Sequence, residues 1–323
     1  MIPIRDTVPS KNYPVINNAI IGVNVMLYLA ELMQGSGLSE FIYIYGLVPA
    51  RYSVPRLRAY FSAGEQIIPF ISFMFLHGGF WHLLGNMWSL YIFGDNVEDR
   101  LGPVRYLLFY LLCGLTSGFV HLIFNLHSNL PTIGASGAIA GVMGAYFILH
   151  PRAKILTLIP LFFIPYFIEL PAFLFLGFWF VLQFINAAGS GGAISGIAWW
   201  AHIGGFIFGI LFLKLFQILP ETGFTDKVQS ITERKKTHRL QVIRPVGPGN
   251  DPHLYGIITV TPHEASDGTL KLVNIPWGFH NRLFRVAVPP GTRDGSKLRL
   301  KGEGRQMENQ MRGDLYLKVV IKS

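Results

Sequence analysis

Ser136 lies in an unusual place for a hydroxyl group. It sits in the stretch Thr132-Ile133-Gly134-Ala135-Ser136-Gly137-Ala138, at the start of an apolar run that reaches His150. Inside a bilayer a hydroxyl needs a hydrogen-bonding partner, and the neighbouring glycines let another helix or a substrate backbone come close. Ser136 is therefore either a helix-packing residue or a nucleophile.

A serine becomes a nucleophile when a base takes its proton, and imidazole is the usual base. His202 is the candidate base, and a hydrogen-bonded structural histidine is the alternative. Gly205 and Gly209, four residues apart on the same apolar run, predict a smooth stripe for contact with a neighbouring helix. Because no Asp or Glu lies near the beginnings of these runs, we expect a two-residue dyad without an acidic residue to orient the base.

His82 and Asn86 are one helical turn apart and share a helix face. Both side chains can donate hydrogen bonds to the oxyanion of a tetrahedral intermediate, together with the backbone N–H of Ser136. Each such donor contributes about 2.7 to 4 kcal/mol in other enzymes. The two residues are therefore candidate oxyanion donors.

Other hydrolytic chemistries fit the chain poorly. His77 and His82 are five residues apart rather than four and have no carboxylate nearby, so we predict no metal site and no cofactor. An aspartyl mechanism needs two facing carboxylates, whereas Asp95, Glu98 and Asp99 lie together at one end of one helix. Nor do the residues around the serine match the Gly-x-Ser-x-Gly elbow of soluble hydrolases.

The composition is that of an integral membrane protein. The 323 residues are 51% hydrophobic and only 14% charged, and the mean hydropathy is +0.40. The net charge of +9 comes mostly from loops and the C-terminal end, which favours the lipid bilayer as a partner and no nucleic acid. Cys113 is the single cysteine and lies in an apolar stretch, so we expect a packed thiol.

Six apolar segments are each about long enough to cross a ~30 Å hydrocarbon core. They are residues 14–33, 75–94, 104–126, 134–150, 170–188 and 197–219. The loop from Gln34 to Phe73 is interrupted by Gly, Pro and Arg, and we expect it to lie in the membrane interface. The stretch Ile155 to Ile168 contains two prolines, which favours a cytoplasmic surface segment over a seventh span. The N-terminus lacks the features of a cleaved signal, so the first segment is expected to stay as an anchor.

Lys and Arg in the short loops predict the orientation. They follow the second, fourth and sixth segments at Arg100, Arg105, Arg152, Lys154, Lys214 and Lys227. The loops 125–132 and 188–197 have none, which is typical of the outer side. Arg51, Arg56 and Arg58 in the long first loop are an exception that snorkelling at the interface can explain. We therefore expect a multi-pass protein of the cell (inner or plasma) membrane with both termini cytoplasmic.

This topology makes the second, fourth and sixth segments begin at the outer face. The polar residues His77, His82, Asn86, Ser136 and His202 all lie at those three beginnings. Polar groups that converge at one depth inside a membrane indicate a functional site, so the nucleophile interpretation of Ser136 gains weight over packing.

The motifs together resemble the rhomboid intramembrane serine proteases. They are His77-Gly78-Gly79-Phe80-Trp81-His82-Leu83-Leu84-Gly85-Asn86, Glu98-Asp99-Arg100-Leu101-Gly102, Gly134-Ala135-Ser136-Gly137, and Ala201-His202 with Gly205 and Gly209. The resemblance covers most of residues 14–219. It implies Ser136 as nucleophile, His202 as base, and His82 and Asn86 as oxyanion donors. It also implies that His77 supports the loop above the site and that Glu98 and Arg100 form a structural pair. The chain departs from the pattern at Ala140, where some members have an aromatic ring against the base, so His202 needs support from elsewhere.

The composition changes after about residue 220. Residues 220–252 are polar and basic and predict a flexible linker next to the membrane. Five short alternating runs then predict a small antiparallel β-domain over residues 253–323, with its Lys and Arg side chains on solvated strand faces. The runs are residues 255–261, 270–275, 283–288, 296–300 and 314–321. Val288-Pro289-Pro290-Gly291 through Lys301-Gly302-Glu303-Gly304, followed by Gly313-Asp314-Leu315-Tyr316-Leu317, resembles the C-terminal substrate-binding domain of DnaJ-type co-chaperones, which implies peptide or partner binding.

We therefore predict an α-helical polytopic membrane protein with six transmembrane helices, rhomboid-like over residues 1–219, followed by a small C-terminal all-β domain. Its predicted function is serine endopeptidase cleavage of transmembrane protein substrates near the outer membrane face, with a cytoplasmic peptide or adaptor at the β-domain. The main alternative is a proteolytically inactive rhomboid-like protein that binds membrane clients. A channel or transporter fits less well, because the polar residues line no continuous path.

Overall fold

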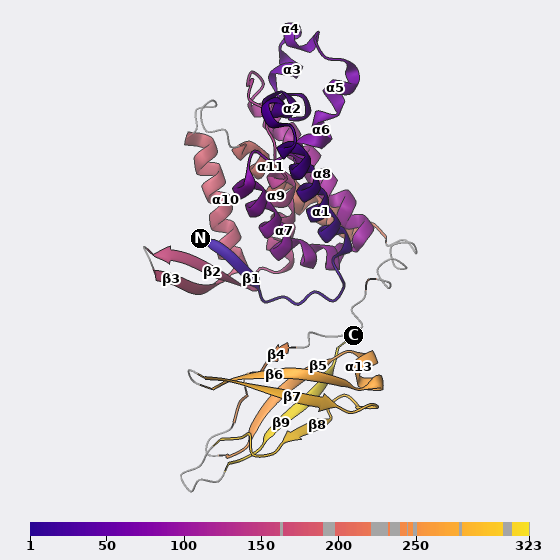
Figure 1. Ribbon diagram of the computed structural model, residues 1–323, viewed down its shortest axis with the longest axis vertical. Coiled ribbons are helices and arrows are strands. Elements are labelled where there is room, and N and C mark those ends of the chain that lie inside the picture. Colours follow the sequence, from indigo (N-terminus) through magenta and orange to yellow (C-terminus); the bar gives the residue numbers. More distant parts are fainter. Residues whose placement is uncertain are drawn as a thin grey trace. The chain divides into compact units, whose positions relative to one another are not determined.

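The computed structural model describes residues 1–161, 164–189, 198–220, 232, 240–243, 245–247, 251–277, 280–305 and 312–322. By their internal contacts these residues form two units, 1–233 and 234–323 (Figure 1). Most of the predicted linker at 220–252 and of the predicted outer loop at 188–197 lies outside the described residues.

All six apolar segments are helical. They form α1 (Val15–Leu32), α7 (Phe80–Leu101), α8 (Pro103–Phe124), α9 (Ser136–Leu149), α10 (Ala172–Gly189) and α11 (Trp199–Ile218) (Figure 1). Within the described residues, α1, α8, α10 and α11 are each long and apolar enough to cross a membrane, and α7 is so together with Ala63–Phe75, across a bend of 74°. Helix α9 has 14 residues, about 21 Å, which is short of a ~30 Å core. Length and composition thus support four or five spans rather than the predicted six.

Helix α9 is enclosed by its neighbours rather than by lipid, since every residue from Gly137 to Tyr146 is buried. Glycines make this enclosure possible. A Cβ built on Gly205 of α11 would lie 1.9 Å from the carbonyl oxygen of Gly137, and one on Gly209 would lie 2.2 Å from that of Gly141. The backbones of α9 and α11 therefore touch where a side chain would hold them apart. Cys113 of α8 packs against Gly141 of α9 and is buried as predicted.

The long first loop folds into short helices at the end of the bundle where α9 begins. These are η1 (Gly35–Gly37), α2 (Leu38–Tyr45), α3 (Ala50–Ser53), α4 (Pro55–Arg58), α5 (Ala63–Ile67), α6 (Pro69–Ser72) and η2 (Phe73–Phe75). Arg51 is fully buried among them, with its guanidinium 4.6 Å from the ring centre of Tyr43 and 4.0 Å from that of Phe61. The expectation that Arg51 snorkels to the membrane surface is therefore wrong, because two aromatic rings hold its charge inside the loop.

This loop also holds the segment that leads into α9. Leu47 and Thr132 exchange backbone hydrogen bonds, and the N–H of Gly134 donates to the carbonyl of Phe73 at 2.8 Å. These backbone hydrogen bonds restrict the conformation of the residues just before Ser136. The first loop thus acts as a brace for the start of α9.

The opposite end of the bundle carries a three-stranded antiparallel sheet in the order β1-β2-β3 (Figure 1). It consists of β1 (Ile2–Asp6), β2 (Lys154–Leu161) and β3 (Ile164–Pro171). The stretch Ile155 to Ile168, predicted to be a surface segment and not a span, thus forms a hairpin. Its prolines face each other as the pair Pro160 and Pro165 near the end of the hairpin, where a missing N–H costs few ladder bonds.

Carboxylates of α7 hold the beginning of α1. Pro14 precedes α1 and provides no side-chain cap, so the first N–H groups of the helix need other acceptors. Glu98 accepts the N–H of Ile16 at 3.0 Å and that of Asn17 at 2.7 Å, and Asp99 accepts the N–H of Asn12 at 2.8 Å. The two carboxylates tie the N-terminal segment to the end of α7.

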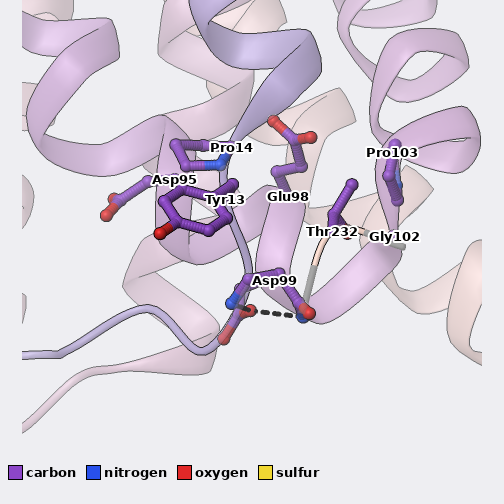
Figure 2. A pocket seen from close by; sticks show the side chains of 9 residues that line it. Tyr13, Pro14, Asp95, Glu98, Asp99, Gly102, Pro103 and Thr232 are labelled. Carbon is purple, nitrogen blue, oxygen red and sulfur yellow. Dashed lines mark hydrogen bonds between the residues drawn. The ribbon is translucent and has the colours of Figure 1, made fainter. Parts of the chain in front are cut away.

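Figure 2 shows Glu98 and Asp99 with Asp95 around Tyr13 and Pro14. The pocket between them has no room inside for a water-sized group, and Glu98 and Asp99 accept hydrogen bonds from the chain itself. The predicted pair of Glu98 with Arg100 does not form in the described part of the chain. Arg100 is exposed, and the orphan N–H groups of α1 are the partners that Glu98 has instead.

The second unit confirms the predicted all-β C-terminal domain. Its elements are β4 (Leu240–Val242), β5 (Leu254–Val260), α13 (Pro262–Asp267), β6 (Thr269–Trp277), β7 (His280–Val288), β8 (Lys297–Leu300) and β9 (Leu315–Ile321). They form two sheets, β4-β6-β7 and β5-β9-β8. The sheets are mixed, not antiparallel as predicted, because β4 pairs with β6 and β5 with β9 in parallel. Such pairs join strands far apart in the sequence, which local turn signals do not reveal.

One lysine in this unit is not on a solvated face. Lys271 on β6 is 1% exposed and pairs with Glu264 of α13, which is 3% exposed. Glu264 also caps α13 through Thr261. The expectation of solvated basic strand faces is therefore wrong at Lys271, whose alternating position in β6 points into the apolar core.

Candidate active site

Ser136 and His202 meet across two helices that are far apart in the sequence. Ser136 is the first residue of α9 and His202 lies in the first turn of α11. The Nε2 atom of His202 is 2.8 Å from the Oγ of Ser136, which is hydrogen-bond distance for a hydroxyl donating to an imidazole. The glycine contacts that press α11 against α9 bring the two side chains together.

The position of Ser136 at a helix start has an electrostatic consequence. The first N–H groups of an α-helix have no acceptor within the helix, and the helix dipole makes this end partly positive. The N–H of Ser136 therefore points to a place where a developing negative charge is stabilised.

The two candidate oxyanion donors lie beside the chain just before Ser136. Gly134 has φ +123°, and a Cβ built on it would lie 2.8 Å from Nε2 of His82 and 3.7 Å from Nδ2 of Asn86. Asn86 is 7% exposed, and its Nδ2 is buried without a partner among the described residues. A side chain at this position would collide with the imidazole, so only a glycine lets the chain pass this close to the two donors.

An unpredicted carboxylate holds His77, whose ring lies against that of His82. The backbone N–H of His77 donates to both carboxylate oxygens of Glu31 on α1, at 2.9 and 3.1 Å. The His77 ring stands edge-on to the His82 ring, with the ring centres 5.2 Å apart. The expectation that no acidic residue lies near the beginnings of these segments is therefore wrong for Glu31, although it bonds to backbone and not to a catalytic imidazole. Glu31 is the single acidic residue in the first apolar segment, and this alone could have marked it as a candidate functional residue.

Gln183 is a second residue that the sequence reasoning missed. It lies on α10, is 5% exposed, and its Oε1 is 2.8 Å from Nδ1 of His202. The indole rings of Trp179 and Trp199 lie 5.9 and 6.0 Å from the imidazole, centre to centre. These groups supply the support for His202 that Ala140 does not. An amide in a largely apolar helix was the available signal, although Gln183 shares it with Asn186.

His121 on α8 is a third missed residue, and it holds the approach to the site. Its Nε2 bonds to the Oγ1 of Thr132 at 2.8 Å, and its carbonyl accepts the side-chain amide of Asn125 at 2.9 Å. Thr132 belongs to the stretch that leads into α9. The histidine therefore fixes both ends of the connection from α8 to α9.

The assembled groups can carry out acyl transfer. A hydroxyl donates to an imidazole nitrogen, and donors from a helix start and from α7 gather on the side where an oxyanion would form. Within the described residues, no group of three His, Cys, Asp or Glu side chains has the arrangement of a metal site.

Comparison with known proteins agrees with this architecture. Residues 64–217 match the rhomboid domain, and residues 225–323 match the DnaJ C terminal domain. Rhomboid protein 1, mitochondrial, of Saccharomyces cerevisiae is 29% identical over 198 residues, which are 60% of this chain and 51% of that protein. Rhomboid protease GluP of Bacillus subtilis is 32% identical over 208 residues, 63% of this chain and 34% of that protein.

RHOMBOID-like protein 4 of Arabidopsis thaliana is 30% identical over 202 residues, 60% of this chain and 41% of that protein. The chain thus spans between about a third and a half of the length of these relatives. In all three the similarity is to rhomboid proteins. This chain is therefore a membrane protein that carries a rhomboid domain, followed by a DnaJ C terminal domain.

Proposed function

We propose that this protein is an intramembrane serine endopeptidase that cuts transmembrane protein substrates with a dyad of Ser136 and His202. The observation that carries the proposal is the 2.8 Å contact between Ser136 Oγ and His202 Nε2. Two polar side chains 66 residues apart meet at the start of α9, inside an apolar bundle. Polar groups are costly in such a place and usually belong to a functional site. The rhomboid match adds a family in which the GluP relative is named a protease.

The proposed reaction follows from the roles of these atoms. His202 takes the proton of Ser136 through Nε2 as Ser136 Oγ attacks the peptide carbonyl carbon. The carbonyl oxygen becomes an oxyanion that accepts from Asn86, His82 and the N–H of Ser136. His202 then gives its proton to the leaving amine as the peptide bond breaks. In the second half His202 takes a proton from a water molecule that attacks the acyl carbon, and returns a proton to Ser136 Oγ as the ester bond breaks.

The direct test is labelling with a fluorophosphonate probe, which reacts with activated serines. The natural protein should be labelled, while Ser136→Ala should not. Ser128→Ala is the matched control, since that serine lies in the loop between α8 and α9 but contacts neither His202 nor His82 in the described bonds. Labelling that persists in Ser136→Ala would refute the nucleophile.

The proposed dyad can also be tested by kinetics. Ser136→Ala and His202→Ala should each reduce cleavage of a model transmembrane substrate to a low residual rate, and the double variant should be no slower than either, because the two residues act in one proton transfer. A double variant far slower than both single variants would show that the residues act separately.

We also propose that the chain makes six passes through the cell membrane, with both termini cytoplasmic and the site near the outer face. The support is the positive charge near the C-terminal ends of α7, α9 and α11, and the hairpin β2–β3, which lies at the end of the bundle opposite the short helices α2 to α6 (Figure 1). In this topology α9 lies in the membrane as a short span enclosed by longer helices.

Single cysteines can test the orientation, because the natural Cys113 is buried. Asn129→Cys lies in the exposed loop between α8 and α9, and Tyr166→Cys lies on the exposed part of β3. In intact cells a membrane-impermeant maleimide should label Asn129→Cys and leave Tyr166→Cys unlabelled until the cells are broken. The reverse pattern would place the site on the cytoplasmic side.

For the second unit we propose client or adaptor binding, through the outward face of the sheet β4-β6-β7. Val242, Leu270 and Leu283 are 58%, 57% and 61% exposed. The strand register places Val242 and Leu283 on either side of Asn274, on the same face as Leu270. Apolar side chains gathered on one sheet face are typical of a binding surface. The match to the DnaJ C terminal domain also supports client binding by this unit.

A tethered client would be cut more readily without any new contact at the active site. Leu270→Ser with Leu283→Ser should therefore slow cleavage of a substrate with a long cytoplasmic tail and leave a tail-less substrate unaffected. Ile257→Ser is the matched control, because Ile257 is 59% exposed on the other sheet. Equal loss on both substrates would refute tethering.

The alternative function is client binding by a proteolytically inactive rhomboid-like protein. Both residues of the dyad are present and in contact, which favours the enzyme. Binding of a transmembrane client without fluorophosphonate labelling of Ser136 would decide for the alternative.

A further inference from the structure

The side-chain amide of Gln183 joins α10 to the imidazole of His202. Its Oε1 lies 2.8 Å from Nδ1 of His202, and its Nε2 donates to the carbonyl of Trp179 at 3.0 Å, one turn earlier on the same helix. Gln183 is 5% exposed and His202 is half-buried. Both ends of the amide are thus engaged, one by the backbone and one by the imidazole.

These two bonds orient the amide without ambiguity. A carbonyl oxygen only accepts, so the atom of Gln183 that faces Trp179 must be the NH₂ group. The atom that faces His202 is then the oxygen, which only accepts as well. Nδ1 of His202 must therefore carry the proton that makes this bond.

The position of one proton decides what the other ring nitrogen can do. A neutral imidazole has a single N–H, so protonated Nδ1 leaves a lone pair on Nε2. That is the nitrogen 2.8 Å from Ser136 Oγ. The tautomer held by Gln183 is the one in which His202 accepts the serine proton, and the same oxygen stabilises the imidazolium that results.

We propose that Gln183 is a positioning residue that holds His202 in the Nδ1–H tautomer facing Ser136, in the place that an acidic residue takes in a triad. The inference rests on the proposed serine endopeptidase function. A neutral amide suits an apolar helix, because a carboxylate in its place would have to be desolvated at far greater cost. No carboxylate bonds to His202 in the described part of the chain, so the amide is the group available for this role.

Three variants separate positioning from packing. Gln183→Leu keeps the approximate volume and removes the acceptor. Gln183→Glu, as a neutral carboxylic acid, keeps a donor for the Trp179 carbonyl and an acceptor oxygen for Nδ1 of His202 at the same reach. Asn186→Leu is the matched control, because Asn186 is an exposed amide three residues further along α10. All three are compared with the natural full chain in detergent, on one model transmembrane substrate.

We expect Gln183→Leu to lower kcat by about tenfold to a hundredfold with KM nearly unchanged, as for loss of a hydrogen bond to a group that becomes charged. Gln183→Glu should recover most of the lost turnover, and Asn186→Leu should match the natural protein. Unchanged kcat in Gln183→Leu, or a Gln183→Glu variant as slow as Gln183→Leu in a folded protein, overturns the proposal.

A measurement without substrate keeps this test separate from the proposed function. In protein with ¹⁵N-labelled histidine, the His202 signals are identified by their loss in His202→Asn, and protonated and bare ring nitrogens are distinguished by their shifts. Neutral His202 with the proton on Nδ1 in the natural protein, and a tautomer mixture in Gln183→Leu, supports the proposal even if cleavage is never seen. A proton on Nε2 in the natural protein overturns it, whether or not Ser136 is labelled by fluorophosphonate.

Discussion

Asn86 shows how a single buried polar atom can indicate chemistry. Its Nδ2 has no partner in the described residues although the side chain is 7% exposed, and a buried donor left unpaired costs about 1 to 3 kcal/mol. A fold tolerates that cost where the donor has a use. The neighbouring Gly134 lets the chain just before Ser136 pass close to this donor.

We predict that Asn86→Ala lowers kcat about tenfold to a thousandfold with little change in KM, since the donor acts on the oxyanion and not on the bound substrate. His82→Ala should lower kcat by as much or more. Steady-state kinetics on a model transmembrane substrate measure both. A large rise in KM at unchanged kcat would instead make the pair part of a substrate pocket.

The packing of α9 against α11 sets the distance between the two proposed catalytic residues. A Cβ on Gly205 or Gly209 of α11 would collide with the backbone of Gly137 or Gly141 on α9. Close-packed interiors accommodate extra volume poorly, and an inserted methyl group typically lowers the free energy of unfolding by about 1 to 3 kcal/mol. The helices must separate to accept one, and His202 moves with α11.

We therefore predict that Gly205→Ala lowers the melting temperature and the rate of fluorophosphonate labelling together. The matched control is Gly85→Ala on α7, where a Cβ meets nothing within 4 Å. That variant should be neutral or stabilising by about 0.5 to 1 kcal/mol, because alanine favours a helix over glycine. Equal effects of the two substitutions would show that the loss of a glycine as such, and not the contact between α9 and α11, changes the stability and the labelling rate.

Strand β1 is held to the bundle by a partly buried carboxylate. Asp6 accepts hydrogen bonds from Tyr146 Oη at 2.5 Å and from Asn96 Nδ2 at 3.0 Å. Burial raises the pKa of Asp6 above its ordinary value of 3.8, against the opposing effect of the Tyr146 bond. The folded state then binds the proton more tightly than the unfolded chain does, so the contribution of Asp6 to stability falls as the pH rises from 3.8 through the raised pKa.

We expect Asp6→Asn to remove that part of the pH dependence. Above pH 3.8 the melting temperature of the natural protein should decline more steeply with rising pH than that of the variant, until the carboxyl is fully ionised. Thermal melts of both proteins in the same detergent over a pH series measure the difference. Parallel curves would show that Asp6 titrates alike in the folded and unfolded chain.

The chain as a whole consists of two units with separate apolar cores. The second core encloses the ion pair of Lys271 and Glu264, both nearly inaccessible. Removing one partner of a buried pair leaves an uncompensated charge, which costs about 3 to 5 kcal/mol. With separate cores, that loss should stay within the second unit.

We predict that Lys271→Ala destabilises residues 234–323, seen as faster proteolysis of this unit, while fluorophosphonate labelling of Ser136 stays at the natural rate. Lys318→Ala is the matched control, because Lys318 lies exposed on β9. A drop in Ser136 labelling with Lys271→Ala would show that the two units fold as one. Full resistance to protease in Lys271→Ala would show that the pair contributes little.

The apolar segments, the composition change near residue 220 and the polar residues at three helix beginnings were all readable in the sequence, because hydropathy and turn residues act locally. The same local signals predicted the strands of the second unit, yet not their parallel pairing, since β5 meets β9 across most of the domain. Local patterns also predicted a full-length span at residues 134–150, where the structure has a 14-residue helix shielded by its neighbours.

The residues around His202 and His77 needed the tertiary structure. Glu31, His121 and Gln183 look like isolated polar residues in apolar runs, and their partners lie between 11 and 46 residues away. Residue type and spacing could indicate that Ser136 and His202 belong together, because few chemistries use a serine and a histidine in a membrane. Which atom faces Nδ1 of His202 depends on how α10 packs against α11, and that packing arises from side chains spread over the whole bundle.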